Sequence, residues 1–257
     1  MLAAQDVFNP SHYAGCRRPL EQAETLPPWC YYDEEFYRAE VEHIFMKVWN
    51  FLGRSDRIPN PGDYFTVNYV GVPLIIVRGK DKVVRAFSNT CRHRGARVAE
   101  DKGNCRAFVC PYHGWAFSTD GSLIGIPHGK GYNGKLDPKD PALALDRVPR
   151  VESYRGFVFA SGANGGPSLA DYLGPMTRAI DNMVDRAPDG EIEMAGGGFR
   201  QRYAGNWKLH MENANDLMHA SIVHASSVDA AQAVADDLED GVEDHALQMF
   251  KGNGLPL

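Results

Sequence analysis

Two cysteines and two histidines fall into two short pairs, and their spacing restricts what this chain can fold into more than any other feature. The pairs are Cys91-Arg92-His93 and Cys110-Pro111-Tyr112-His113, with sixteen residues between them. Each pair combines one thiol with one imidazole. Gly95 and Gly114 follow the histidines and permit the backbone to turn tightly there. This arrangement predicts one metal centre held by two loops of a small domain.

The mixed pairs favour a Rieske-type iron–sulfur centre, a [2Fe–2S] cluster. In such a centre two thiolates hold one iron and two imidazoles hold the other, so each loop supplies one of each. Zinc is an alternative for two Cys and two His, although zinc motifs usually pair Cys with Cys and His with His. A coincidence of four residues in a β domain is the third possibility. We expect the cluster, with Cys91, His93, Cys110 and His113 as its ligands.

The remaining cysteines and most other histidines fit no metal motif. Cys105 lies between the two loops and matches no ligand position, so we expect a small packing residue there. The other residues without an expected role are Cys16, Cys30, His12, His43, His128, His210 and His245.

A second constellation follows in the C-terminal part of the chain. The pattern of residues 213–223 predicts a helix, on which Asp216 and His219 share one face. A carboxylate so placed accepts the spare N–H of a metal-bound imidazole. His219 and His224 stand about 140° apart on an ideal helix, so the helix must end or distort between them if both bind one ion. The pair fits two legs of a 2-His-1-carboxylate site for Fe(II), and plain surface residues are the alternative.

The pattern of hydrophobic residues divides the chain into three parts. Residues 33–49 show helical spacing after an acidic first turn. From 50 to 161, short runs of Val, Ile, Phe and Tyr alternate with Gly, Pro and Asn turns, which predicts antiparallel strands. Beyond 161 the pattern favours a helix over 169–185, interrupted at Gly174-Pro175, and a strand over 199–209.

Both constellations resemble motifs of one known family. The two loops are similar to the cluster-binding loops of Rieske proteins, in the branch of the ring-hydroxylating oxygenases. The respiratory branch has an extra cysteine in each loop, where this chain has Ala96 and Tyr112. The second segment resembles the E-N-x-x-D-x-x-H-x-x-x-x-H signature of Rieske oxygenase large (alpha) subunits, preceded by Asn-Trp-Lys. The matching positions are Glu212, Asn213, Asp216, His219 and His224.

The resemblance implies an α+β fold with three segments. An all-β Rieske domain at 47–161 would be inserted into a catalytic domain, a helix-wrapped antiparallel sheet by analogy with the family. That catalytic domain would be built from 1–46 and 162–257 and would be incomplete.

The resemblance also implies an O2-dependent oxidoreductase, either a mono- or a dioxygenase. Electrons from NAD(P)H would reach the cluster through a ferredoxin or flavin reductase and pass to mononuclear Fe(II), where an organic, aromatic substrate is hydroxylated. The family forms homotrimers, in some members with a small beta subunit. Asp216 matches the acid that links His219 of one subunit to His113 of the next, so we assign it a catalytic role. The sequence does not choose the substrate or the reaction type.

The third iron ligand is the point where the resemblance breaks. The family's carboxylate ligand lies well downstream of the second histidine, and only 33 residues follow His224. We therefore expect this chain to be a C-terminally truncated fragment. A Rieske electron-transfer protein and a catalytically incomplete fragment remain alternatives to an active oxygenase. The acidic residues that follow His224 are Asp229, Asp236, Asp237, Glu239, Asp240, Glu243 and Asp244.

Composition excludes several other classes. The net charge of −6 argues against a nucleic-acid partner. The longest apolar clusters, such as 72–77, are too short to span a bilayer. The N-terminus lacks the basic start and apolar run of a secretory signal, so we expect a cytoplasmic protein without membrane contact.

Overall fold

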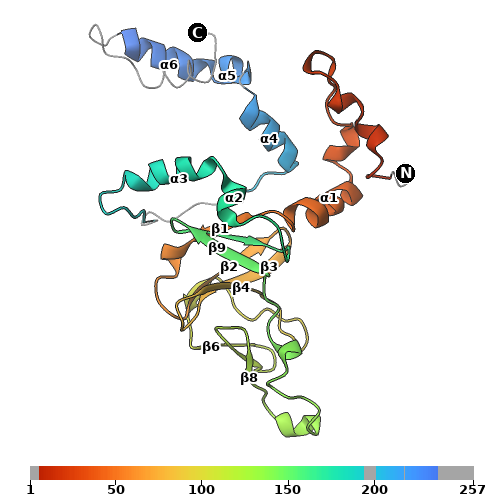
Figure 1. Cartoon of the computed structure of the whole chain (residues 1–257), viewed down its shortest axis with the longest axis vertical. Helices are drawn as coiled ribbons and strands as arrows, with labels where there is room; N and C mark the ends of the chain where they lie inside the picture. The colour runs from red at the N-terminus through yellow and green to blue at the C-terminus, as the bar shows by residue number, and fades with distance from the viewer. Residues whose placement is uncertain (1–5, 194–200, 217, 237–257) are drawn as a thin grey trace. The chain divides into compact units, whose positions relative to one another are not determined.

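The computed structural model describes residues 6–193, 201–216 and 218–236, and it divides the chain into two compact units. The β-rich unit comprises residues 38–199. The helical unit combines residues 1–37 with 200–257. The α+β class is confirmed, since the described residues contain both antiparallel sheets and helices (Figure 1).

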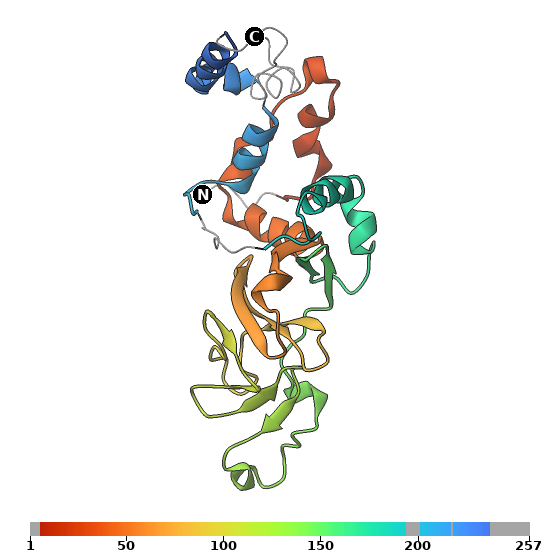
Figure 2. The same ribbon diagram turned by 90° about the vertical axis from the view of Figure 1, so that its left-hand side faces the viewer.

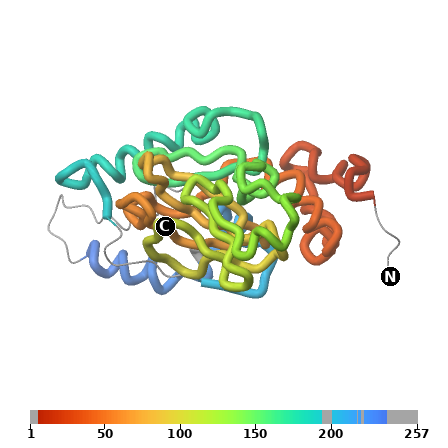
Figure 3. The backbone as a smooth tube through the Cα atoms, turned by 90° about the horizontal axis from the view of Figure 1, so that it is seen from below, coloured from red at the N-terminus to blue at the C-terminus, as the bar shows by residue number. Residues whose placement is uncertain are grey.

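The β-rich unit contains three antiparallel sheets, as its alternating sequence pattern predicts. The first sheet has the order β1-β10-β9, the second β4-β3-β2-β5 and the third β6-β7-β8. Figure 2 shows the third sheet at the end of this unit remote from α2 and α3, and Figure 3 views that end from below. The strands are β1 (Asn50–Arg54), β2 (Asp63–Tyr69), β3 (Val72–Arg78), β4 (Val84–Ser88), β5 (Lys102–Asn104), β6 (Ala107–Val109), β7 (Ala116–Ser118), β8 (Leu123–Gly125), β9 (Arg150–Tyr154) and β10 (Phe157–Ser161).

Strand β3 separates two hydrophobic cores, which explains its continuous apolar run. Successive side chains of a strand point to opposite faces of the sheet. Leu74 and Ile76 therefore enter one core with Phe65. Ile75 and Val77 enter the other, which also contains the two cysteines of the Cys/His pairs. The second core thus connects the central strand directly to the proposed cluster loops.

Two α-helices follow β10 in the described part of the β-rich unit. Ser168 caps α2 (Leu169–Leu173) by accepting the N–H of Asp171, and Gly174 ends it. Helix α3 (Met176–Asp185) follows, so the interruption expected at Gly174-Pro175 is confirmed. Residues 162–193 thus cluster with the β strands, whereas the sequence analysis grouped 162–257 together; the boundaries at 46 and 161 stay a prediction.

The helical unit has no strand among residues 6–37, 201–216 and 218–236. Helix α1 (Glu34–Glu40) starts in it and continues as a π-helix, Val41–Phe45, within the predicted 33–49. The C-terminal part contains α4 (Trp207–Asn215), α5 (Met218–Val223) and α6 (Ala225–Asp236). The short 3-10 helices of the N-terminal part are Pro10–Tyr13, Gly15–Arg17, Leu20–Gln22 and Pro28–Tyr31.

Two secondary-structure predictions in this unit are wrong. The strand expected over 199–209 is a helix from Trp207 onward, because the Asn206 side chain accepts the N–H of Lys208 and caps α4; residues 199 and 200 lie outside the described part. The continuous helix expected over 213–223 is broken, since Asp216 has an extended backbone and ends α4.

No helix in the described part of the chain combines the length and apolar character that crossing a membrane requires.

Candidate metal centres

The two Cys/His loops of the β-rich unit form the same backbone turn twice. In each, the Cys N–H donates to the carbonyl five residues ahead at 2.8 Å, and the N–H four residues ahead donates back to the Cys carbonyl at 2.9 Å. Each turn also needs a glycine in the left-handed region, at φ values of 75° and 71°. The residues involved are Cys91, Gly95 and Ala96 in the first turn, and Cys110, Gly114 and Trp115 in the second.

These turns bring together the four residues that the sequence analysis assigned as ligands. Cys91 and Cys110 are 3% and 2% exposed and belong to the same core. The rings of His93 and His113 have their centres 4.6 Å apart at an angle of 70°. An imidazole nitrogen binds a metal at about 2.1 Å, which leaves two rings on one ion roughly 5 Å apart. The histidine spacing therefore suits one iron.

A buried nitrogen without a partner supports this fit. Among the described residues, Nδ1 of His93 is inaccessible to water and has no hydrogen-bond partner. An orphaned buried nitrogen is costly unless something binds it. Burial lowers the pKa of His93, and His113 and Arg94 lower it further, which favours the neutral imidazole that metals require.

The thiol of Cys91 is also placed for a metal rather than for free solution chemistry. Burial raises its pKa, and the neighbouring Cys110 side chain adds to the increase. Two buried thiolates side by side repel each other. A cationic centre between them removes that repulsion, so the pair suits an iron and does not suit a reactive nucleophile.

Asn89 holds the base of the first turn, and the sequence analysis missed it. It is 2% exposed, and its Oδ1 accepts the N–H groups of Val98 and Ala99 at 2.9 and 3.0 Å. Its Nδ2 donates to the Ala99 carbonyl at 2.7 Å. The amide therefore closes the loop that carries Cys91. A polar residue directly after the β4 pattern was the only available signal.

Aromatic residues pack against both histidines. The Trp115 side chain stacks on His93, with ring centres 4.9 Å apart and an angle of 4°. The ring of Tyr112 has its centre 3.8 Å from that of His113, and Tyr112 is 58% exposed. The cysteine side of the site is thus enclosed, whereas the histidine side reaches the surface.

The first turn is also tied to the chain beyond the third sheet. The Arg92 guanidinium forms an ion pair with Asp146 at 2.7 Å and donates to the Ala142 carbonyl at 3.2 Å. The second turn is packed more tightly, because a Cβ on Gly114 would come within 2.9 Å of Pro127. Both loops are therefore fixed from outside as well as by their own hydrogen bonds.

The second constellation lies where α4, α5 and α6 meet. The prediction that Asp216 and His219 share one face of a helix is wrong, because Asp216 precedes α5. Its Oδ1 accepts the N–H groups of Met218 at 2.8 Å and His219 at 3.3 Å. Its Oδ2 lies 3.6 Å from Nδ1 of His219. The carboxylate therefore caps α5 and also faces the imidazole.

The two histidines of this constellation approach each other. Helix α5 ends at Val223 and α6 starts at Ala225, so the helical path is interrupted at His224. Such an interruption is what we expect if His219 and His224 bind one ion. The centres of the His219 and His224 rings are 5.3 Å apart, close to the spacing in the first site. Nδ1 of His219 is buried and has no hydrogen-bond partner in the described part of the chain.

A third ligand for this pair is not found among residues 6–193, 201–216 and 218–236, where no three His, Cys, Asp or Glu side chains are arranged to hold one ion. Of the seven acidic residues that follow His224, Asp229 and Asp236 are described, and Asp236 accepts a hydrogen bond from Gln232. The other five lie outside the described residues.

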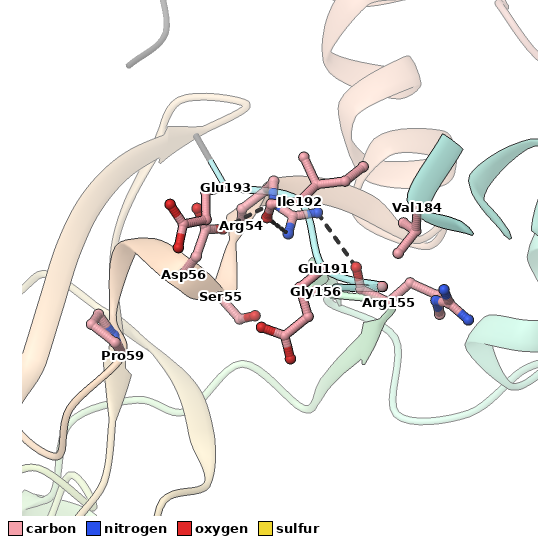
Figure 4. Close-up of a pocket in the computed structure, with 11 residues that line it drawn as sticks. Arg54, Ser55, Asp56, Pro59, Arg155, Gly156, Val184, Glu191, Ile192 and Glu193 are labelled. Carbon is pink, nitrogen blue, oxygen red and sulfur yellow. Dashed lines mark hydrogen bonds and ion pairs between the residues drawn. The ribbon is translucent and has the colours of Figure 1, made fainter. Parts of the chain in front are cut away.

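A cavity of about 760 Å³ in the β-rich unit contains none of the predicted metal ligands. Arg54 forms its centre and donates to Asp56 at 2.9 Å, to the Arg155 carbonyl at 3.4 Å and to the Ile192 carbonyl at 2.5 Å (Figure 4). Because the structure uses this guanidinium internally, we assign the cavity no part in the chemistry.

Comparison with known proteins gives a family match within the β-rich unit and relatives that align with most of the chain. The family model of the Rieske [2Fe-2S] domain matches residues 48–149. The benzene 1,2-dioxygenase alpha subunit of Pseudomonas putida is 38% identical over 85% of this chain. The alpha subunit of N,N-dimethyl phenylurea N-demethylase from Sphingobium sp. is 37% identical over 84%. These alignments cover 48% and 47% of the relatives, so the chain spans about half their length.

Solved structures of oxygenases are also similar to this chain. Naphthalene 1,2-dioxygenase from Rhodococcus sp., bound to indole, matches with a TM-score of 0.70 and 36% identity, over 80% of this chain and 47% of that one. A quaternary ammonium Rieske monooxygenase in complex with L-carnitine matches with a TM-score of 0.72 and 29% identity, over 80% and 57%.

Proposed function

Because the chain belongs to the family of Rieske oxygenase large (alpha) subunits, we propose that it works in an O2-dependent oxygenase component. The observation that carries this proposal is the doubled turn that brings two buried cysteines and two adjacent histidines together. We assign Cys91, His93, Cys110 and His113 as the ligands of a [2Fe–2S] cluster. Residues 47–161 would form the cluster-binding domain, and 1–46 with 162–257 part of the catalytic domain.

Mononuclear Fe(II) is the second group we propose, with His219 and His224 as two of its ligands. The orphaned Nδ1 of His219 and the 5.3 Å spacing of the two rings support it. When bound, the cluster would supply single electrons and the mononuclear iron would activate O2. The chain's own residues would orient these groups.

Asp216 would connect the two centres. One of its oxygens caps α5 and the other lies near His219. In a homotrimer, we propose that this second oxygen also binds His113 of the neighbouring subunit. A carboxylate between two imidazoles fixes both ring orientations and offers a short path for electrons. The half-buried His113, at the surface side of the cluster site, supports such an approach.

The partners follow from the same proposal. A ferredoxin or flavin reductase would deliver electrons from NAD(P)H, and a small beta subunit would accompany the trimer in some assemblies. We propose a small aromatic compound as substrate, since the relatives are named for benzene, naphthalene and biphenyl. The relative crystallised with L-carnitine is a reason to test amines as well. We propose a cytoplasmic location.

A Rieske electron-transfer protein is the competing function. It needs the cluster loops but not a capped pair of histidines. The break at His224 and the capping of α5 by Asp216 therefore favour the oxygenase.

Iron counting tests the proposal. The chain is prepared anaerobically with iron and sulfide, desalted, and analysed for iron, acid-labile sulfide and EPR of the reduced cluster. Three irons and two sulfides per chain support the oxygenase. Two irons and two sulfides support the carrier or a catalytically incomplete fragment, and a colourless protein containing zinc contradicts all three.

A further inference from the structure

Tyr31, at the end of an N-terminal 3-10 helix, contacts α4 at three positions. Its carbonyl accepts the side-chain N–H of Asn206 at 3.0 Å, and Asn206 is the residue that caps α4. Its hydroxyl donates to Oε1 of Glu212 at 2.5 Å. Its ring lies 5.6 Å from the ammonium group of Lys208. One residue therefore contacts α4 from its N-cap to Glu212.

Lys208 strengthens the contact from the helix side. It is only 7% exposed, although lysine is rarely buried. Its ammonium group lies 5.0 Å from the Phe36 ring and 5.3 Å from the Trp207 ring, in addition to Tyr31. Three aromatic faces around one ammonium attract it through their quadrupoles.

The C-terminal end of α4 adjoins the second metal constellation, because Asp216 directly follows the helix. Lys208 and Glu212 are four residues apart and share one face of the helix. Four residues further on, α4 has ended and Asp216 caps α5, whose second residue is His219. Any rotation or axial shift of α4 therefore moves the carboxylate and the imidazole together.

We propose that Tyr31 is a positioning residue that holds α4 so that His219 and His224 can bind one metal ion. This inference rests on the proposed function, since it presupposes the mononuclear site. It adds a contact between residues 181 apart in sequence, which no local motif contains. The hydroxyl of Tyr31 aligns the helix, and the ring contributes the contact with Lys208.

Cobalt(II) binding to the full chain tests the role of the hydroxyl. The cluster is kept oxidised and diamagnetic, so the EPR signal of high-spin cobalt reports only the second site. Tyr31→Phe removes the hydroxyl and keeps the ring beside Lys208, and Glu212→Ala removes the acceptor. Loss of a residue that supports a metal ligand weakens affinity roughly tenfold, and we expect that loss together with a changed EPR line shape.

Three further variants make the test specific. Tyr32→Phe is the matched control, because Tyr32 is the neighbouring tyrosine and is 71% exposed. Glu212→Gln keeps an acceptor oxygen and should retain affinity close to that of the unaltered chain. The double variant of Tyr31→Phe and Glu212→Ala should bind no more weakly than either single variant, since both remove the same hydrogen bond.

The outcomes distinguish the two levels of the argument. Weaker cobalt binding in Tyr31→Phe, with full cluster absorbance, supports the inference. Equal affinities in Tyr31→Phe and Tyr32→Phe overturn it and leave the proposed function intact. If the unaltered chain binds no metal besides the cluster iron, the mononuclear site and the inference are both wrong.

Discussion

The Cys/His turns of the β-rich unit and the His219/His224 pair of the helical unit are held in different ways. The turns rest on a core in which Ile75, Val77 and Phe117 are fully buried, and their own backbone hydrogen bonds close them. In the helical unit, Met218, Ile222 and Val223 around the histidines are 68%, 79% and 69% exposed. The first site is thus set by local sequence and a closed core, the second by a cap and a few distant polar contacts.

This difference predicts that the two sites load independently. Cys91→Ser or Cys110→Ser should abolish the cluster, because a hydroxyl cannot replace a thiolate that holds iron. We expect nearly all cluster absorbance, iron and sulfide to disappear. Cobalt binding to the His219/His224 pair should stay unchanged by EPR.

Cys105→Ser is the control for that experiment. Cys105 is half-buried, and its N–H donates to the Gly62 carbonyl, so it takes no part in the backbone hydrogen bonds of the two turns. It should keep full cluster content. Loss of cobalt binding together with the cluster would contradict the independence of the two sites.

Asn89→Ala tests how far the first site depends on its buried frame. The change removes three hydrogen bonds and leaves the amides of Val98 and Ala99 buried without a partner. We expect the free energy of unfolding to fall by about 3 kcal/mol. Urea denaturation of the cluster-loaded chain measures this, and the cluster should also be lost at lower urea concentration.

An exposed asparagine provides the comparison. Asn68 accepts one hydrogen bond, from the Gly71 N–H at 2.7 Å, at the tip of the β2–β3 hairpin. Asn68→Ala should cost less than about 1 kcal/mol. Similar losses in both variants would mean that the Asn89 bonds do not stabilise the loop as the geometry indicates.

The same contrast explains what the sequence alone could predict. The residues proposed as cluster ligands and most of the strands lie in short, periodic or motif-like segments, so their pattern is local. The helix over 213–223 was wrong because the side chain of Asp216 satisfies the amides of α5 and ends the helical path. Asn89 and the Tyr31–Glu212 bond have no sequence signature, because their partners are fixed only by tertiary packing.

Two substitutions at Asp216 separate its role as the cap of α5 from the role of its negative charge beside His219. Asp216→Ala removes the acceptor of the Met218 and His219 amides and should cost α5 about 1 kcal/mol. Hydrogen exchange at these two amides should then accelerate about fivefold. Asp216→Asn keeps the cap and should leave exchange unchanged.

Electron transfer tests the charge itself. Both variants remove the carboxylate that faces His219. Assayed with enough metal to keep the second site loaded, both should slow single-turnover transfer between the centres. Asp229→Ala, an exposed acidic residue on α6, is the control and should change neither measurement. Normal transfer in Asp216→Asn would exclude the bridging role and leave the cap in place.

The smallest expected effect concerns the proton that Tyr31 shares with Glu212. The hydrogen bond to Glu212, and secondly burial, raise the pKa of Tyr31 to about 12 from its ordinary value of 10.0. A raised pKa means that the folded chain holds the proton more tightly than the unfolded chain. The stabilising contribution is therefore complete below pH 10 and is lost as the pH rises to about 12. A rapid pH jump, with ultraviolet absorbance read before unfolding, should show one phenol titrating near pH 12 that is missing in Tyr31→Phe. In Glu212→Gln the neutral acceptor should return the pKa of Tyr31 toward 10.0. If the titration that Tyr31→Phe removes is already centred near pH 10.0 in the unaltered chain, the hydrogen bond between Tyr31 and Glu212 does not stabilise the helical unit.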